Sequence, residues 1–388
     1  MRSKSLLRRF TLALAISGWL AGLAASQTKE PVIALMDPSD AALFRGWAVA
    51  TDETAHGNVD ERVLGLEKVV RGMLANPGVD ASRIYLVGRA AFSATVFYAA
   101  SHIPDLWAAV AMVGGSPGAA IDTGRIFTAN LSHVPILWAG LGADDPALAE
   151  TIKAAGVKLD FLPIKESLPG SDLVQWLRQR TREEYPETID CETTALSFGR
   201  CYWIEITKFD PQERNDLLRS TQLKPRSSAV LQLRGFRYAP DDPGPGLTIT
   251  YIEPAFATQI KIGDRITALD GKPIANASQF EKILETITEG RPAVLMIERG
   301  KERRRFETSV VVPKRDAVVT ARVQAKRIPE SDSIEIISRQ VSALRVTVPR
   351  QWVPVEVNWN GLGMEKLTEP GCVELWIEKE LLRSGKCR

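Results

Sequence analysis

The stretch that decides the fold of the first part of the chain reads Arg83-Ile-Tyr-Leu-Val-Gly88-Arg-Ala90-Ala-Phe92-Ser-Ala-Thr-Val-Phe-Tyr98. Its apolar first half predicts a buried strand, and the residues after the glycine predict a sharp turn into a helix. Ala90 stands at the apex of this predicted turn.

This stretch resembles the nucleophile elbow of secreted α/β-hydrolases, in which Gly-x-Ser-x-Gly lifts a catalytic serine out of the sheet. The preceding run Val79–Gly88 and the next apolar strand, in Ala108–Pro117, carry the same resemblance to esterases. Ala90 replaces the serine, and Phe92 replaces the second small residue. The resemblance therefore implies a degenerate hydrolase-like domain.

The acid and the base of that fold are not where the resemblance places them. Asp144 or Asp145, in the loop after the strand Pro135–Ala139, is a remnant of the acid at best, and no histidine follows the next strand, Leu159–Ile164. The fold uses the chain order serine, acid, histidine. All the histidines of the chain precede the candidate acid: His56, His102 and His133. We therefore predict no catalytic residue here.

Two serines keep an alternative open, namely an active secreted serine esterase or peptidase with a non-standard nucleophile. Ser93 falls inside the following helix, where a hydroxyl tends to bond a backbone carbonyl, and Ser116 lies near the same rim. Without a general base, either hydroxyl is a weak nucleophile. The early segment that would supply oxyanion donors reads Met36-Asp-Pro-Ser-Asp40.

Length and composition predict several domains. The chain has 388 residues with 45% apolar content, which is long for a single core. Its 49 Lys and Arg against 47 Asp and Glu give a net charge of +2, which argues against a nucleic-acid binder. The basic run Lys301–Arg305 is short, and such a run is typical of a solvated hairpin.

The first residues predict an export signal. Met1–Arg9 is basic, Phe10–Leu23 is apolar, and Ala24-Ala-Ser26 offers small residues for cleavage. The twin-arginine and general secretory routes both fit Arg8-Arg9, and an uncleaved anchor is the competing interpretation. We predict a periplasmic or secreted bacterial protein, with no stable membrane span after cleavage near Ser26.

Export favours disulfides between the four cysteines. Of the three possible connectivities, the sequential one, Cys191–Cys201 and Cys372–Cys387, is the simplest and is the one that we predict. The first pair flanks a segment that could form a loop, and the second brackets the last strand. Neither spacing is Cys-x-x-Cys and no histidine is adjacent, so we predict no metal site and no cofactor.

A second resemblance, to PDZ domains of bacterial exported type, covers residues 227–314. Its most specific run is Lys261–Ile274, with a tight turn at Gly263-Asp264 and a hairpin turn at Asp270-Gly271. The flanking runs, which have strand or helix periodicity, are Ser228–Tyr238, Gly246–Pro254, Asn276–Ile287, Ala293–Gly300 and Arg304–Val312.

PDZ domains add a peptide strand to a sheet edge and hold its C-terminal carboxylate in a backbone nest. The resemblance places that nest around Gly235, with Arg234 in place of the usual glycine. It places Phe280 and Leu284 on the groove-side helix, although ordinary core packing explains their spacing equally well. The residues that the resemblance implies for peptide binding are Leu233, Arg234, Gly235, Phe236, Tyr238, Phe280 and Leu284.

The segments around the PDZ-like run alternate apolar and polar residues, which is typical of antiparallel strands. They resemble the C-terminal β-sandwich of some exported esterases, whose first strand would be Arg200–Thr207 here. That resemblance implies a PDZ domain inserted between the first and second strands. A separate all-β domain from Asp316 onward is the alternative. Three tryptophans would permit carbohydrate or surface binding if they are exposed: Trp352, Trp359 and Trp376.

The sequence thus predicts a multidomain α/β plus β protein, which acts as an exported scaffold for C-terminal peptides or proteins and is catalytically inactive. The predicted parts are a signal peptide (1–26), a degenerate α/β-hydrolase-like domain (27–186), a linker with the first sandwich strand (187–226), the PDZ domain (227–315) and the β-sandwich (316–388).

Overall fold

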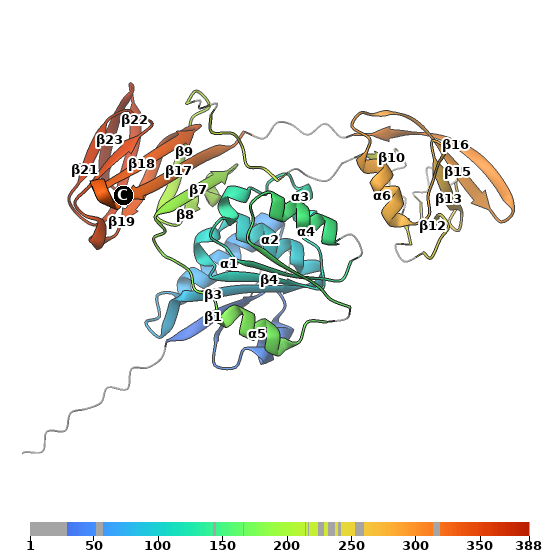
Figure 1. Cartoon of the computed structure of the whole chain (residues 1–388), viewed down its shortest axis with the longest axis horizontal. Helices are drawn as coiled ribbons and strands as arrows, with labels where there is room; N and C mark the ends of the chain where they lie inside the picture. Colours follow the sequence, from blue (N-terminus) through green and yellow to red (C-terminus); the bar gives the residue numbers. More distant parts are fainter. Residues whose placement is uncertain are drawn as a thin grey trace, which may run out of the picture.

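The computed structural model describes residues 29–387 except 52–56, 143–144, 166, 214, 216, 224–228, 232–236, 240–241, 253–259 and 313–318. Within these residues the chain forms an α/β unit, a PDZ unit and a β unit, in which four sheets are present (Figure 1). None of the helices that the structure describes is long and apolar enough to cross a membrane.

The α/β unit is a six-stranded parallel sheet, which confirms the predicted fold class of this part. Its strands in spatial order are β2 (Ala48–Thr51), β1 (Glu30–Leu35), β3 (Val79–Arg89), β4 (Ala109–Val113), β5 (Ile136–Gly140) and β6 (Leu159–Pro163). The chain runs outward from β1 in both directions, so the strand order reverses between β1 and β3. In open parallel sheets, ligands bind beyond the carboxyl ends of the strands at such a reversal.

Helices cover both faces of this sheet (Figure 1). One face is covered by α1 (Val59–Met73), α2 (Ser93–His102), α3 (Gly118–Asp122) and α4 (Asp145–Ala154), and the other by α5 (Gly170–Arg178) and the 3₁₀ helix η1 (Pro38–Leu43). Strands buried on both faces are continuous apolar runs, which explains the sequence of β3 and β4. The first helix, α1, is capped by Asn58, which exchanges hydrogen bonds with Glu61.

The PDZ unit has its own sheet and its own hydrophobic core. Asp270 (φ 49°) and Gly271 (φ 77°) form the two-residue hairpin turn that the sequence predicted, and Asn276 caps α6 (Ala277–Glu285). Its strands in spatial order are β10 (Val230–Leu231), β16 (Glu302–Val311), β15 (Arg291–Arg299), β13 (Arg265–Leu269), β12 (Leu247–Tyr251) and β11 (Arg237–Tyr238), with β14 (Lys272–Pro273) paired to β13.

The β unit contains two five-stranded sheets whose inward side chains belong to one hydrophobic cluster. The first is β21 (Met364–Leu367), β20 (Val355–Trp359), β18 (Ser333–Arg339), β17 (Ala321–Ile328) and β7 (Thr188–Thr193). The second is β23 (Leu381–Lys386), β22 (Gly371–Glu378), β19 (Val341–Val348), β9 (Ile204–Phe209) and β8 (Arg200–Cys201).

Three strands of the β unit, β7, β8 and β9, precede the PDZ unit, where the sequence predicted one strand over Arg200–Thr207. That segment is broken because Tyr202 has a left-handed φ of 54°, which turns the chain between β8 and β9. In the sheets, β7 pairs with β17 and β9 pairs with β19, both of which follow the PDZ unit. The PDZ unit therefore interrupts the β unit after its third strand, and the prediction of an insertion after the first strand was wrong.

Candidate functional site

The chain turns sharply at Ala90, between β3 and α2, and we call this turn the elbow. Its φ of 47° lies in the left-handed region, which costs an L-residue other than glycine about 1 kcal/mol. The turn is packed tightly, because a Cβ atom on Gly115 would collide with the Ala90 carbonyl, and one on Gly88 would lie 2.6 Å from Val96 Cγ2. The apex carries only a methyl group, so this geometry presents no hydroxyl.

The two serines near the elbow are placed differently. Ser93, the first residue of α2, is fully buried, and its Oγ has no hydrogen-bond partner within the described residues. Ser116 is exposed, and its Oγ accepts a 3.3 Å hydrogen bond from the Gly118 amide. Neither hydroxyl therefore shows a contact with a general base in the part of the chain that the structure covers.

The described histidines lie at the other end of the sheet. His102 ends α2, about 13 Å from Ser93 by helical rise, and His133 comes just before β5. Each precedes a strand and so lies at the amino-terminal edge, whereas Ala90 follows β3 at the carboxyl-terminal edge. The third, His56, lies outside the described residues.

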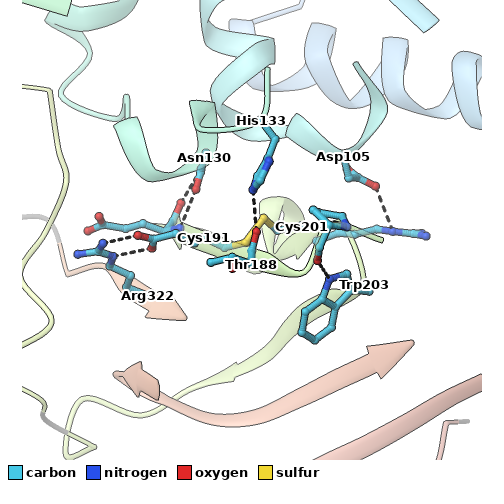
Figure 2. The surroundings of a disulfide bond; sticks show 12 residues. Asp105, Asn130, His133, Thr188, Cys191, Cys201, Trp203 and Arg322 are labelled. Carbon is cyan, nitrogen blue, oxygen red and sulfur yellow. Dashed lines mark hydrogen bonds and ion pairs between the residues drawn. A yellow bond between two sulfur atoms is a disulfide. The ribbon is translucent and has the colours of Figure 1, made fainter. Parts of the chain in front are cut away.

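Both histidines have structural partners. The Nδ1 of His102 donates to the Tyr98 carbonyl (2.9 Å), and the two rings stack at 3.8 Å between centroids. Burial lowers the pKa of His102 to about 4, so the ring is neutral at pH 7. His133 donates from Nε2 to the Thr188 carbonyl at 2.7 Å (Figure 2).

Acidic side chains at the elbow edge are held by local contacts. Asp145, the first residue of α4, is buried and accepts from the Gly142 amide at 2.9 Å. The amide of Ser39 donates to Asp37, and this hydrogen bond lowers the pKa of Asp37. In the same segment the Asp40 carboxylate pairs with Arg89 Nε at 2.6 Å. The alternative acid remnant, Asp144, lies outside the described residues.

In the PDZ unit, β11 lies at the end of the sheet and contacts α6. Among the described strands β11 ends the sheet, and it pairs with β12 through Tyr238 and Ile249. The Tyr238 ring meets the Phe280 ring edge-on at 5.9 Å, and its hydroxyl donates to Glu281 Oε1 at 2.9 Å. Burial, together with this hydrogen bond, raises the pKa of Tyr238, so the hydroxyl stays protonated.

The structure describes three of the predicted peptide-binding residues, and their positions differ. Phe280 is 2% exposed and belongs to the core, whereas Leu284 is half-buried next to that core, and Tyr238 joins β11 to α6. Glu281 was missed, because a contact between a strand and a helix leaves no periodic signal in the sequence. Outside the described residues lie Leu233, Arg234, Gly235 and Phe236.

The predicted cysteine pairing is confirmed. Cys191 on β7 bonds Cys201 on β8, and Cys372 on β22 bonds Cys387 after β23. The first bond joins the two sheets of the β unit, because β7 and β8 belong to different sheets. Asn130 and Arg322 form hydrogen bonds in the same region (Figure 2).

Tryptophan burial removes the basis for a three-tryptophan binding surface on the β unit. Trp359 is fully buried and donates from Nε1 to Ser338, and Trp352 is buried as well. Only Trp376 is partly exposed among these three.

Comparisons with known proteins agree with the geometry of the PDZ unit. A PDZ domain family model matches residues 230–310, so this part of the chain is a PDZ domain, a kind of domain that binds peptides or proteins. None of the curated proteins matches the chain. The chain is similar to the solved structure of a thermostable esterase, with 14% identity and a TM-score of 0.27 over 40% of this chain and 55% of that one. It is also similar to an aminopeptidase N family protein from Idiomarina loihiensis, with 16% identity and a TM-score of 0.18 over 40% of this chain and 24% of that one.

Proposed function

We propose that the chain is an exported scaffold that binds the C-termini of peptides or proteins between β11 and α6 of its PDZ domain. The observation that carries this proposal is the position of β11 at the end of the sheet and next to α6. An edge strand offers backbone donors and acceptors that an added peptide strand satisfies. The half-buried Leu284 supplies an apolar wall for the last side chain of the peptide.

The carboxylate nest of this proposal is assigned to Leu233–Phe236, which precede Arg237 in the sequence. Gly235 gives it a residue with free access to left-handed backbone angles, and Arg234 adds a positive charge. The assignment of these four residues rests on the sequence resemblance.

The α/β unit is, in this proposal, a hydrolase-like domain without catalysis. Three observations support the absence of catalysis. Ala90 carries only a methyl group, His102 and His133 lie at the opposite edge of the sheet, and Asp145 is held by a local contact. Acyl transfer needs nucleophile, base and acid assembled within hydrogen-bond reach. The β unit completes the proposed architecture as a β-sandwich.

Export is part of the same proposal. The basic and apolar run at the start of the chain has the pattern of a signal peptide, and two disulfides fit an oxidising compartment. We place the mature protein in the periplasm or outside the cell.

One observation favours the second candidate function, a serine hydrolase with a non-standard nucleophile. The Oγ of Ser93 is close to the elbow and has no partner among the described residues. Its complete burial opposes this role, because a substrate carbonyl would not reach it. Labelling of wild-type protein by a fluorophosphonate that is abolished by Ser93→Ala would favour this candidate.

Isothermal titration of the mature full chain tests the proposed function. A peptide ending in a free carboxylate and an apolar residue should bind, and the same peptide with an amidated C-terminus should bind at least about tenfold more weakly, because the nest amides favour an anion. Leu284→Gln should weaken the acid peptide about tenfold, since it removes apolar burial. The control is Glu285→Gln, an exposed position on the same helix. Equal binding of acid and amide peptides would show that the groove is not a carboxylate site.

A further inference from the structure

A groove of about 290 Å³ lies on the second sheet of the β unit, where β8, β9, β19 and β22 meet. Its polar lining includes Arg200, Glu205, Arg345 and Thr347, and the disulfide Cys372–Cys387 forms part of its wall. We call it the arginine groove. It uses neither the elbow at Ala90 nor any residue of the PDZ domain.

The sheet register brings these side chains together. On β19 the buried residues Leu344 and Val346 alternate with Arg345 and Thr347, which therefore point to the outward face. Arg345 is the cross-strand partner of Glu205, and Glu205 is in turn the partner of Arg200.

A second row on the same face completes the groove. Thr347 stands opposite Cys372, whose disulfide with Cys387 gives this end an apolar surface. Tyr202, from the turn between β8 and β9, is a further lining residue.

The charges in the arginine groove do not balance. Arg345 Nη1 lies 3.7 Å from Glu205 Oε2, beyond hydrogen-bond distance, and the buried Arg345 Nε has no acceptor within the described residues. Arg200, with 54% of its side chain exposed, approaches Asp105 only at 3.5 Å. That carboxylate already accepts two hydrogen bonds from Arg71.

The charged residues that line the groove are thus two arginines, Arg200 and Arg345, and one carboxylate, Glu205. Glu374 is the partner of Arg345 on β22, but it does not line the groove. The Arg345 side chain is 35% exposed, so its guanidinium group is accessible to an anion in the groove.

We propose that the arginine groove binds a small α-amino acid with an apolar side chain. A planar carboxylate matches the fork of a guanidinium, which makes Arg345 the anchor and Arg200 the second donor. Glu205 accepts from the ammonium group of the same ligand. The disulfide and Tyr202 contact its side chain. The volume restricts the ligand to a small molecule, because drug-sized ligands occupy pockets of roughly 300 to 1,000 Å³.

Titration of the mature full chain with three related probes tests the assignment. L-Phenylalanine should bind, L-phenylalaninamide should bind at least about tenfold more weakly because it lacks the carboxylate, and N-acetyl-L-phenylalanine should lose affinity because it lacks the ammonium group. Absence of L-phenylalanine binding at about 10 mM, or equal binding of acid and amide, would overturn the proposal.

Variants separate this groove from the rest of the molecule. Arg345→Gln should reduce L-phenylalanine affinity at least about tenfold, and Arg200→Gln, at a side chain that is 54% exposed, should reduce it as well. The matched control is Arg303→Gln, whose side chain is 77% exposed on the PDZ domain and paired with Glu298. Leu284→Gln should also leave this affinity unchanged, since it alters only the PDZ groove. Unchanged affinity in both Arg345→Gln and Arg200→Gln would refute the assignment.

Discussion

At the scale of single residues, Ala90 shows that packing can hold an alanine in a left-handed backbone conformation. The left-handed φ of 47° and the close approach of Gly115 keep the apex of the elbow in place. The turn is therefore maintained by packing between β3, β4 and α2. Its presence alone says nothing about catalysis, which depends on the side chain at the apex and on a base.

A serine at position 90 tests whether a hydroxyl at this turn is enough for catalysis. We expect Ala90→Ser to hydrolyse p-nitrophenyl acetate no faster than the wild-type protein, because His102 and His133 lie at the opposite edge of the sheet. Rates should be measured together with fluorophosphonate labelling. A gain of about a thousandfold, or stoichiometric labelling, would reveal a general base near the elbow.

His102 makes a testable contribution to pH-dependent stability. Burial lowers its pKa from 6.5 to about 4, so the unfolded chain binds a proton in this range before the folded chain does. The contribution of His102 to the free energy of unfolding is fully present above pH 6.5. It is lost as the pH falls from 6.5 towards 4, which lowers the free energy of unfolding by roughly 3 kcal/mol.

We expect His102→Phe, which retains a ring to stack on Tyr98, to lack this component of the pH dependence. Urea unfolding of both proteins at several pH values between 4 and 6.5 measures it. Parallel pH profiles for the two proteins would contradict the buried, neutral state of His102.

At the scale of elements, the two disulfides differ in what they connect. Cys191 and Cys201 are 3% and 4% exposed and join the two sheets, whereas Cys372 is exposed and its bond closes the hairpin of β22 and β23. Reductant reaches an exposed disulfide in the folded protein, but a buried one only after local opening.

We therefore expect mild dithiothreitol to reduce Cys372–Cys387 first, with most of the fold retained. The double variant Cys191→Ser/Cys201→Ser should lose about 3 kcal/mol of unfolding free energy, and Cys372→Ser/Cys387→Ser should lose less, because a hairpin at a sheet edge frays without opening the core. Peptide mapping during reduction and urea unfolding measure the two effects. Reduction of Cys191–Cys201 first would contradict the burial difference.

At the scale of the whole molecule, the α/β and β units share a buried polar interface. The Asn130 side chain donates to the carbonyls of Ser101 (2.5 Å) and Glu192 (2.8 Å) and accepts from the Glu192 amide (2.7 Å). The fully buried Glu192 carboxylate accepts from the amide and hydroxyl of Thr221 and pairs with Arg339 at 3.1 Å.

The same interface anchors the chain where it leaves for the PDZ domain. Thr221 accepts from the Thr128 amide, and the Leu223 amide donates to the Ile126 carbonyl. Leu223 packs into the α/β core, whereas the PDZ domain has a separate core. The first two units are therefore coupled through this interface, and the described residues of the PDZ domain form a core of their own.

We expect calorimetry to show two thermal transitions, one for the PDZ domain and one for the α/β and β units together. Asn130→Ala should lower the midpoint of the joint transition by leaving buried groups unpaired, at a cost of about 1 to 3 kcal/mol, and should not shift the PDZ transition. Asn276→Ala, which removes the N-cap of α6, should lower the midpoint of the PDZ transition and leave the joint transition unchanged. A shift of both transitions by either variant would show that the PDZ domain unfolds with the rest.

The sequence by itself determined the apolar strands of the α/β unit, the sharp turn at Ala90 and the Asp270-Gly271 turn of the PDZ domain. Each of these depends on residue patterns within a short segment, because local backbone preferences and apolar periodicity are properties of neighbouring residues. The sequence left three cysteine connectivities open, and the structure shows the sequential one. Only the tertiary structure decided that β9 pairs with β19 across the PDZ insertion, that the Cys191–Cys201 bond joins two sheets, and that Phe280 is core while Tyr238 binds Glu281. These features depend on strand register and on contacts between segments far apart in the chain, which no short pattern encodes.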